Sequence, residues 1–290
     1  MRILLTGSQG QLGQHLVSYL NGKVELLATG RDSLDITNKN QVIDKVKTFN
    51  PDYIINAAAY TAVDNAEDDS ERCYAINRDG PAHLAEAANI ANAVLLHIST
   101  DYVFDGSAEQ PYTEDMPTNP LNVYGASKLA GEQAVAEIAR KFLIIRTSWV
   151  FGEYGNNFVK AILRLAATRN MLNIVNDQFG GPTYSGDIAN TLINLIHYIE
   201  HGNTPAWGIY HYSGTPAVSW FEFADAILER AKAHNLFEAY PKLSGIPSVD
   251  YPTKAKRPAN SVLNCDRIAK QFGLAPSQWL SAINDIEKYK

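Results

Sequence analysis

Apolar residues in the first half of the chain alternate between short continuous runs and stretches with helical spacing. The continuous runs are rich in Ile, Leu and Val, as strands buried on both faces usually are, and they cover 2–6, 24–29, 53–56, 93–99 and 142–147. Between them, apolar residues recur three or four positions apart at about 11–20, 41–49, 70–89 and 124–140. This alternation predicts an α/β fold with a Rossmann-type, doubly wound parallel sheet.

The second half of the chain has a looser pattern. Helices are expected at 158–168, 185–199, 220–233 and 265–272, and strands at 172–175 and 208–213. The segments between them are polar and aromatic, and loops of that kind commonly carry binding groups. We therefore expect a sheet domain of residues 1–147 with about 183–212, and a smaller, interleaved C-terminal lid domain of residues 148–182 and 213–290.

A glycine-rich turn, Gly7-x-x-Gly10-x-x-Gly13, follows the first strand and leads into the first helix. Glycine allows a sharp turn and the close approach of a pyrophosphate, and the free N–H groups of the helix N-terminus bind its charge. A strand before the glycines and a helix after them is the context that makes the motif informative. The sheet domain is thus predicted to bind NAD(P).

The choice of cofactor depends on the residues after the second strand, Gly30-Arg31-Asp32. Arg31 favours the 2'-phosphate of NADPH, whereas an acid such as Asp32 can accept hydrogen bonds from the free ribose of NADH. NADPH is expected, and NADH stays open. An ion pair between the two side chains within the loop is the alternative without a binding role.

Small and polar residues follow two further strands at their carboxyl ends. Ala57, Ala58 and Ala59 would let a flat cofactor lie against the backbone. Ser99 and Thr100 point to opposite faces of their strand, so only one of them can face the cleft. Asn77, on the helix between these strands, either reaches the site or packs against another helix.

The sequence Tyr124-Gly125-Ala126-Ser127-Lys128 begins a predicted helix. Residues four apart share a helix face, so the phenol and the ammonium are expected to lie close together. A nearby cation lowers a phenol pKa that starts near ~10, which would make Tyr124 an acid/base group. Tyr19 and Lys23 have the same spacing, but Asn21 and Gly22 end that helix, and we expect a surface position.

Charge and composition narrow the class of protein. The chain has 290 residues, of which 46% are hydrophobic, a formal net charge of −6 and two cysteines, Cys73 and Cys265. No Lys/Arg cluster attracts nucleic acid, no apolar run approaches the ~18 residues of a membrane span, and the cysteines and histidines lack metal-site spacing. The N-terminal apolar run is too short for a signal peptide. We expect a cytoplasmic protein without nucleic-acid or membrane partners.

Four motifs together resemble the extended short-chain dehydrogenase/reductase superfamily: the glycine-rich turn, Asn56-Ala57-Ala58, Ser99-Thr100-Asp101-Tyr102, and Tyr124-Gly125-x-x-Lys128. Within it, segments 120–125, 146–150, 155–158, 177–183 and 257–263 resemble the dTDP-4-dehydrorhamnose reductase family, and the resemblance spans nearly the whole chain. It implies NAD(P)H-dependent reduction of the C4 ketone of dTDP-4-dehydro-L-rhamnose to dTDP-L-rhamnose, the last step of dTDP-rhamnose biosynthesis.

The resemblance also implies roles for individual residues. The implied catalytic residues are Tyr124, Lys128 and Thr100. The implied cofactor-binding residues are Gly7, Gly10, Gln11, Leu12, Gly13, Arg31, Asp35, Ile36, Ala59, Tyr60 and Thr61, together with Tyr124 and Lys128. The implied substrate-binding residues are Val63, Thr100, Asp101, Trp149, Asn157, Gln178 and Arg257. Arg257 would grip the diphosphate, with a structural ion pair as the alternative.

A homodimer is also expected from the family. Some members bridge the dimer through magnesium held by carboxylates, but His15 stands at one of these positions, so no metal is predicted. Two other functional classes stay open. One is a nucleotide-sugar epimerase or dehydratase that holds NAD tightly, and the other is a non-catalytic regulatory subunit of the methionine adenosyltransferase type. The complete set of Tyr124, Lys128 and Thr100 favours catalysis.

Overall fold

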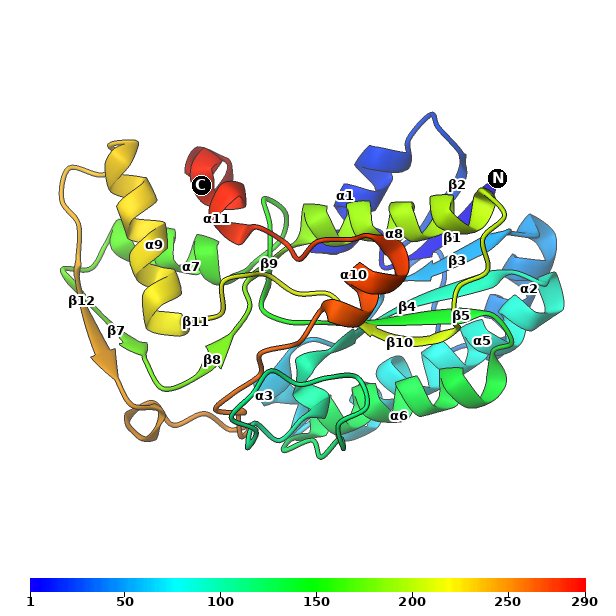
Figure 1. The fold of residues 1–290 in the computed structure, drawn as a ribbon, viewed down its shortest axis with the longest axis horizontal. Coiled ribbons are helices and arrows are strands. Elements are labelled where there is room, and N and C mark those ends of the chain that lie inside the picture. The colour runs from blue at the N-terminus through cyan, green and yellow to red at the C-terminus, as the bar shows by residue number, and fades with distance from the viewer.

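The computed structural model describes residues 1–290, and a six-stranded parallel sheet occupies one half of the molecule, on the right in Figure 1. In sheet order the strands are β2 (Glu25–Thr29), β1 (Arg2–Thr6), β3 (Tyr53–Asn56), β4 (Val94–Thr100), β5 (Phe142–Thr147) and β10 (Gly208–His211). All the pairings are parallel. The predicted Rossmann-type fold is therefore confirmed.

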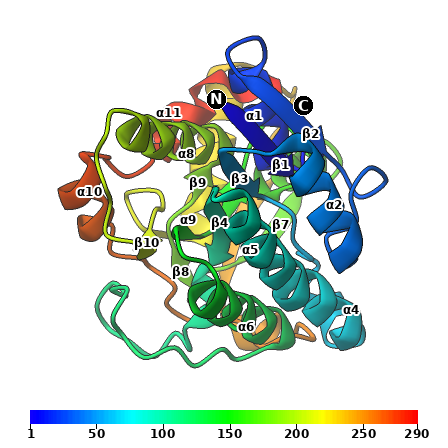
Figure 2. The ribbon, with the colours of Figure 1, turned by 90° about the vertical axis from the view of Figure 1, so that its right-hand side faces the viewer.

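Alternating side chains of each strand belong to two separate apolar clusters, one on each face of the sheet. Ile3 and Leu5 face the cluster that contains Leu16 of α1 (Gln11–Leu20), whereas Leu4 faces the opposite cluster. Figure 2 shows the resulting three layers. One helical layer holds α1 and α8 (Ser185–Glu200), and the other holds α2 (Lys39–Phe49), α5 (Gly80–Ala91) and α6 (Val123–Ile138).

One predicted helix is wrong in its continuity. The expected helix at 70–89 is divided into α4 (Ser70–Tyr74), a π-helical turn (Ala75–Asp79) and α5. Pro81 has no amide hydrogen to donate to the carbonyl of Asn77, which favours the wider turn. A Cβ on Gly131 of α6 would lie 2.0 Å from that same carbonyl oxygen, so glycine allows the turn and α6 to touch.

The C-terminal part of the chain packs mainly around a third apolar cluster, which includes Phe151, Phe223 and Trp279. Its helices are α7 (Phe158–Ala166), α9 (Trp220–Ala233) and α11 (Trp279–Ala282), followed by a 3-10 segment (Ile283–Tyr289). Three two-stranded sheets connect it: β6 (Val150–Phe151) with β9 (Thr183–Tyr184), β8 (Phe179–Gly180) with β11 (Val218–Ser219), and β7 (Met171–Val175) with β12 (Lys242–Ile246). Of these strands the sequence pattern predicted only β7.

The remaining elements are short. They are α3 (Val63–Ala66), α10 (Asp266–Phe272) and two 3-10 turns (Asp101–Val103 and Ser248–Asp250). Apart from the divided helix, the predicted helix and strand ends lie within two residues of the observed ones. The chain returns to the central sheet at β10, after leaving it at Thr147. The proposed domain limits stay a prediction.

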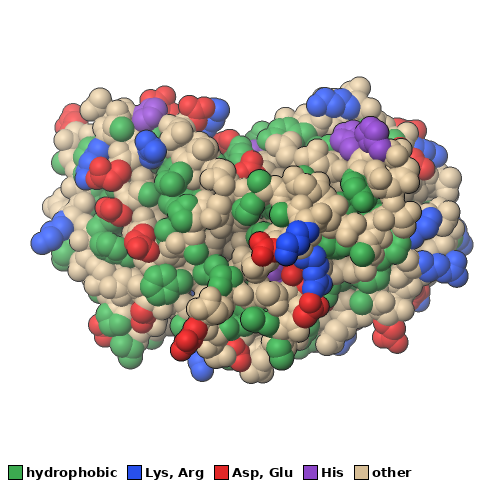
Figure 3. Space-filling model, viewed as in Figure 1, with side chains coloured by type: hydrophobic (Ala, Val, Ile, Leu, Met, Phe, Trp, Pro, Cys, Tyr) green, Lys and Arg blue, Asp and Glu red, His purple; other side chains and the backbone are tan.

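Three global properties bear on function. No helix combines the length and apolarity needed to cross a bilayer. Cys73 and Cys265 are both free and buried. Acidic and basic side chains are intermixed over the face drawn in Figure 3.

Candidate active site

The glycine-rich turn packs closely against the loop after β3. Gly7 has a φ of +73°, and a Cβ there would lie 2.5 Å from the amide nitrogen of Ala58. A Cβ on Gly13 would lie 2.1 Å from the carbonyl oxygen of Gly7. At the start of α1, Gly10 supplies no side chain to cap the free N–H groups. These groups are therefore available to an anion, as a dinucleotide cradle requires.

A cavity of about 250 Å³ opens beside this turn. Of the residues predicted to bind cofactor, those that line it are Gly7, Gly10, Arg31, Asp35, Ile36 and Ala59. Leu12 and Gly13 do not line it: the side chain of Leu12 belongs to the apolar core, and Gly13 packs against the turn. Thr61 is exposed, outside this cavity.

Two residues at this cavity differ in how free their side chains are. Asp35 Oδ1 accepts hydrogen bonds from Thr37, at 3.0 Å from the amide and 2.8 Å from the hydroxyl, so this carboxylate stabilises its own turn. Arg31 is exposed and forms no ion pair with Asp32 or any other acid within 4 Å. The alternative of a structural loop ion pair is therefore wrong.

Asn77, whose role the sequence left open, holds the loop that carries Tyr60. Its side chain accepts a hydrogen bond from the amide of Tyr60 at 2.8 Å and donates one to the carbonyl of Tyr60 at 3.1 Å. The same amide nitrogen donates to Ser127 Oγ of α6 at 3.0 Å, and Ser127 in turn donates to the carbonyl of Tyr124 at 2.7 Å. Asn77 thus joins the predicted cofactor loop to the helix that carries Tyr124 and Lys128.

The three predicted catalytic residues meet at the carboxyl end of β4. Thr100 is the last residue of β4, and the Tyr124 side chain, near the start of α6, lies beside it. Lys128, one helical turn further along, is 1% exposed, and its Nζ donates to the carbonyl of Ile98 at 2.6 Å. Asn122 is the N-cap of α6, and its side chain accepts a hydrogen bond from the amide of Gly125 at 2.8 Å.

The expected lowering of the Tyr124 pKa is wrong for this structure. Burial raises the pKa of Tyr124 well above its usual value, although the hydrogen bond with Thr100 acts in the opposite direction. Burial also lowers the pKa of Lys128 to about 8, against the charge of Glu132, which raises it. Desolvation is the largest cause of the raised Tyr124 pKa, so the phenol holds its proton at neutral pH.

Ser99 points to the other face of β4, as alternation requires, and leaves Thr100 to the cleft. The Ser99 hydroxyl donates a hydrogen bond to Glu132 Oε1 at 2.5 Å. Glu132 also pairs with Arg146, whose Nη2 lies 2.7 Å from Oε2. Both members of this ion pair are almost fully buried, at 3% and 2% exposure. The pair supports α6 from beneath the predicted catalytic residues.

Asp101 and Trp149 follow the ends of two neighbouring strands. Asp101 is buried, which raises its pKa to about 6, and its Oδ1 accepts from Thr100 at 2.9 Å. Trp149 stands two residues beyond Thr147, the register partner of Thr100. Val63, also predicted to bind substrate, begins the short helix α3.

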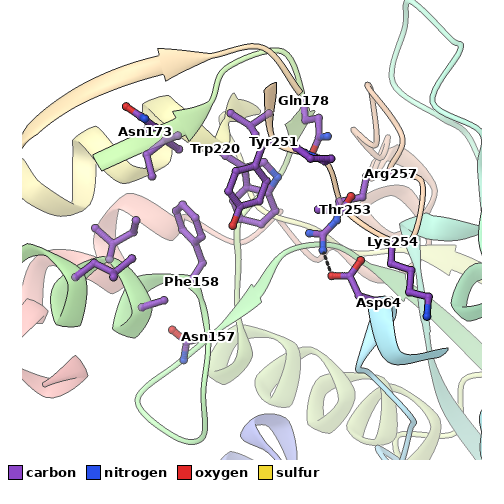
Figure 4. A pocket seen from close by; sticks show the side chains of 16 residues that line it. Asp64, Asn157, Phe158, Asn173, Gln178, Trp220, Tyr251, Thr253, Lys254 and Arg257 are labelled. Carbon is purple, nitrogen blue, oxygen red and sulfur yellow. Dashed lines mark hydrogen bonds and ion pairs between the residues drawn. The ribbon is translucent and has the colours of Figure 1, made fainter. Parts of the chain in front are cut away.

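A second, larger cavity, of about 730 Å³, lies between α7, β7 and the 251–257 segment (Figure 4). It brings together three predicted substrate residues, Asn157, Gln178 and Arg257. Arg257 forms an ion pair with Asp64 at 2.8 Å, while its buried Nε has no partner. The structural ion pair considered for Arg257 is thus present, and one donor is left free.

Sequence reasoning missed several residues that line this cavity, namely Phe158, Trp220, Tyr251 and Lys254. In Figure 4 the labelled aromatic side chains lie toward one end and the Arg257–Asp64 pair toward the other. Lys254, Lys256 and Arg257 form a short basic run in an acidic chain. This run is the one signal in the sequence that points to the cavity, and it corrects the expectation that the chain has no local Lys/Arg cluster.

Asn157, just before α7, also contacts α1, the helix that follows the glycine-rich turn. Its Nδ2 donates to Gln11 Oε1 at 3.0 Å and to the carbonyl of Gly152 at 2.7 Å. Nearby, His15 Nε2 lies 3.0 Å from Glu153 Oε2. No group of three or more metal-ligating side chains forms here or elsewhere.

A dinucleotide cradle at the edge of a Rossmann-type sheet, beside a buried Thr–Tyr–Lys arrangement, defines the class of short-chain dehydrogenases/reductases with a nicotinamide cofactor. Comparison with known proteins gives the particular family. The model of the RmlD substrate binding domain family matches residues 1–289, and the chain belongs to this family.

Individual relatives agree with that assignment. The chain is 50% identical to the dTDP-4-dehydrorhamnose reductase of Aggregatibacter actinomycetemcomitans over 290 residues, which cover 99% of both chains. Its fold is similar to that of a Bacillus anthracis dTDP-4-dehydrorhamnose reductase solved in complex with NADP, with a TM-score of 0.90, 38% identity and coverage of 97% and 96%. A Clostridium acetobutylicum dTDP-4-dehydrorhamnose reductase also has a TM-score of 0.90, with 37% identity and coverage of 98% of both chains.

Proposed function

We propose that this protein is an NAD(P)H-dependent oxidoreductase that reduces the C4 ketone of dTDP-4-dehydro-L-rhamnose to dTDP-L-rhamnose. The observation that carries the proposal is the buried Thr100–Tyr124–Lys128 arrangement, which lies at the same end of the sheet as the cradle. The relatives named dTDP-4-dehydrorhamnose reductase, at up to 50% identity, support this substrate class.

The residues around the cradle fit a nicotinamide dinucleotide. The tight contacts of Gly7 and Gly13 leave the backbone bare where a pyrophosphate would approach, and the uncapped start of α1 offers N–H donors. Tyr60 and Thr61 would then meet the inner ribose and nicotinamide, with Asn77 fixing the backbone of Tyr60. When bound, the reduced nicotinamide supplies the hydride.

The chain's own groups supply the remaining chemistry. Tyr124, protonated at neutral pH, donates its proton to the C4 oxygen as negative charge develops there. Thr100, whose hydroxyl donates to Asp101 Oδ1 in this structure, would turn that single donor to the C4 oxygen and stabilise the charge. The Lys128 ammonium binds the nicotinamide ribose and favours the phenolate left after proton transfer.

The large cavity is proposed to take the nucleotide part of the substrate. Its cations, Arg257 and Lys254, would meet the diphosphate, and the unpartnered Nε of Arg257 is available as a donor. Phe158, Trp220 and Tyr251 offer aromatic faces to the base. Asp101, Trp149 and Val63 would contact the hexose between this cavity and Tyr124.

The decisive experiment follows the absorbance of NADPH and NADH with dTDP-4-dehydro-L-rhamnose as substrate. Stoichiometric oxidation of the cofactor with formation of dTDP-L-rhamnose is expected. An epimerase or dehydratase would instead carry tightly held NAD and consume none. A regulatory subunit would show no turnover and would bind a methionine adenosyltransferase.

Replacing Arg31 with Ala is expected to lower kcat/KM for NADPH by roughly tenfold or more, because a charge-assisted contact with the 2'-phosphate is lost. The value for NADH should hardly change, since its ribose lacks that phosphate. Steady-state kinetics with both cofactors measure the effect. Asp32→Ala is the matched control and should leave kcat/KM for NADPH unchanged. An unchanged NADPH/NADH ratio in Arg31→Ala would contradict the role.

The pH dependence is expected to follow Lys128. Its pKa of about 8 means that the ammonium is present below that pH and is lost above it, while Tyr124 remains protonated. We expect kcat/KM for NADPH to fall about tenfold per pH unit above pH ~8. Lys128→Met should show low activity without this descending limb. A wild-type profile that stays flat to about pH 9.5 would rule the assignment out.

Three broader expectations accompany the proposal. We infer a cytoplasmic location, supported by the two free, buried cysteines. A homodimer without bridging metal is proposed from the family, with His15 engaged by Glu153. The division into an NAD(P)-binding domain (1–147 and about 183–212) and a lid (148–182 and 213–290) is supported by the separate apolar cluster around Phe223.

A further inference from the structure

Trp149 has a backbone conformation that side chains other than glycine rarely adopt. Its φ is +45°, in the left-handed region. Its carbonyl oxygen accepts a hydrogen bond from the amide of Thr183 at 3.2 Å. Since Thr147, two residues earlier, pairs with Thr100 of β4, this strained residue stands at the catalytic edge of the sheet.

The indole of Trp149 is confined on two sides. It stacks on Trp220 with ring centroids 3.4 Å apart and planes 5° from parallel. A Cβ on Gly180 would lie 2.5 Å from Cε2 and 2.6 Å from Nε1 of the same indole. Any side chain at position 180 would therefore have to displace Trp149.

The two neighbours that confine the indole belong to one small unit. β8 pairs with β11 so that Gly180 stands opposite Val218, and Trp220 follows directly after β11. Ser219 and Glu222 form a capping box at the start of α9, with the Ser219 amide 2.6 Å from Glu222 Oε2. Gly180 and Trp220 are thus held in a fixed relation to each other.

Trp220 also lines the large cavity, where Phe158 packs against it at 4.6 Å between ring centroids. Trp220 therefore belongs both to the cavity proposed for the nucleotide and to the stack with Trp149, whose backbone follows the strand that pairs with Thr100. A ligand that lies across both regions would pass over this pair.

We propose that Trp220 and the bare backbone of Gly180 position Trp149, so that its indole forms a fixed platform for the hexose of the nucleotide sugar. Trp220 is a positioning residue in this view, because it acts on the hexose through Trp149. The inference rests on the proposed function and adds the device that aligns the C4 ketone with Tyr124.

Gly180→Ala and Trp220→Ala test the platform. Each is expected to lower kcat/KM for the keto-sugar by roughly 100-fold, since a small misplacement of the reacting carbon has effects of that order. The KM for NADPH should stay within about threefold of wild type, as the cradle is untouched. Trp220→Phe, which keeps an aromatic face, should recover most of the loss. Trp207→Phe, away from the stack, is the matched control and should behave as wild type.

A double-mutant cycle separates positioning from a general structural effect. If Trp220 acts through Trp149, then Trp220→Ala should add less than about threefold to the loss already caused by Trp149→Ala. Affinities for dTDP and dTDP-L-rhamnose, measured by calorimetry, supply a second readout. Gly180→Ala should keep the affinity for dTDP and lose the additional affinity that the hexose gives.

The outcomes distinguish the two proposals. If the wild-type protein fails to oxidise NADPH with the keto-sugar, the proposed function is overturned. If the wild type turns over and Gly180→Ala keeps both its kcat/KM and its preference for dTDP-L-rhamnose over dTDP, the positioning inference alone is overturned. Multiplicative losses in the Trp149/Trp220 cycle would likewise overturn it. Should Trp220→Ala fail to fold, Gly180→Ala and Trp220→Phe still decide the matter.

Discussion

Replacing Tyr124 with Phe is expected to reduce kcat by about 10²–10⁴-fold, the usual contribution of a positioned general acid. The substitution removes only the hydroxyl and keeps the ring that packs edge-on against Tyr102, with ring centroids 5.7 Å apart. Because the cradle is formed by other elements, the affinity for NADPH should change by less than about threefold. Stopped-flow and steady-state assays of NADPH oxidation measure the two quantities.

Tyr19→Phe is the matched control for this experiment. Tyr19 and Lys23 have the same spacing as Tyr124 and Lys128, but α1 ends at Leu20, before Lys23. The Tyr19→Phe substitution should leave kcat unchanged. Near-normal turnover by Tyr124→Phe would remove the phenol from the proton transfer and with it the proposed mechanism.

Replacing Glu132 with Gln is expected to lower the free energy of unfolding by about 3–5 kcal/mol, because it leaves the buried guanidinium of Arg146 without a counter-charge. The pair is almost fully shielded from water, and Glu132 also receives the hydroxyl of Ser99 at 2.5 Å. Urea denaturation followed by circular dichroism gives the difference between the variant and the wild type.

Glu137→Gln provides the comparison, because Glu137 lies on the same helix but is exposed and unpaired. Its effect should stay within about 0.5 kcal/mol. The double variant Glu132→Gln/Arg146→Met should be more stable than Glu132→Gln alone, since it removes the guanidinium that has lost its counter-charge. A loss below about 1 kcal/mol in Glu132→Gln would show that water or another group compensates Arg146.

The central sheet could be predicted because the apolar run of each strand agrees with its burial on both faces of the sheet. Continuous apolar runs marked all of the strands up to β5, and alternation along them explains why Ile3 and Leu4 enter different cores. The glycine spacing also carried geometric information, since Gly7 and Gly13 have no room for a Cβ. Alternation likewise assigned Thr100 to the cleft once Ser99 was found against Glu132.

Features that depend on long-range contact could not be predicted. The pairing of β7 with β12 joins segments about seventy residues apart, and β12, with Lys, Ser and Gly among its five residues, is only weakly apolar. The π-helical turn depends on the contact of Asn77 with Gly131 as well as on Pro81. The sequence predicts the wrong direction for the Tyr124 pKa shift, because the spacing of Tyr124 and Lys128 indicates a neighbouring charge but not how deeply the phenol is buried.

The same limit applies to the candidate substrate cavity. Its aromatic lining, Phe158, Trp220 and Tyr251, comes from three distant segments, and each residue alone resembles an ordinary packing residue. Asp64 and Arg257 are separated by 193 positions, yet they form one ion pair. Only the fold shows that these groups share a cavity.

The position of β10 has a consequence for biosynthesis of the chain. Five strands of the sheet are complete once residue 147 has left the ribosome, but the sixth ends at His211. During the intervening synthesis the outer edge of β5 has no hydrogen-bonding partner, although most of its residues are apolar. Unpaired strand edges promote association between nascent chains, so the interval between residues 147 and 211 is when this protein most needs a chaperone.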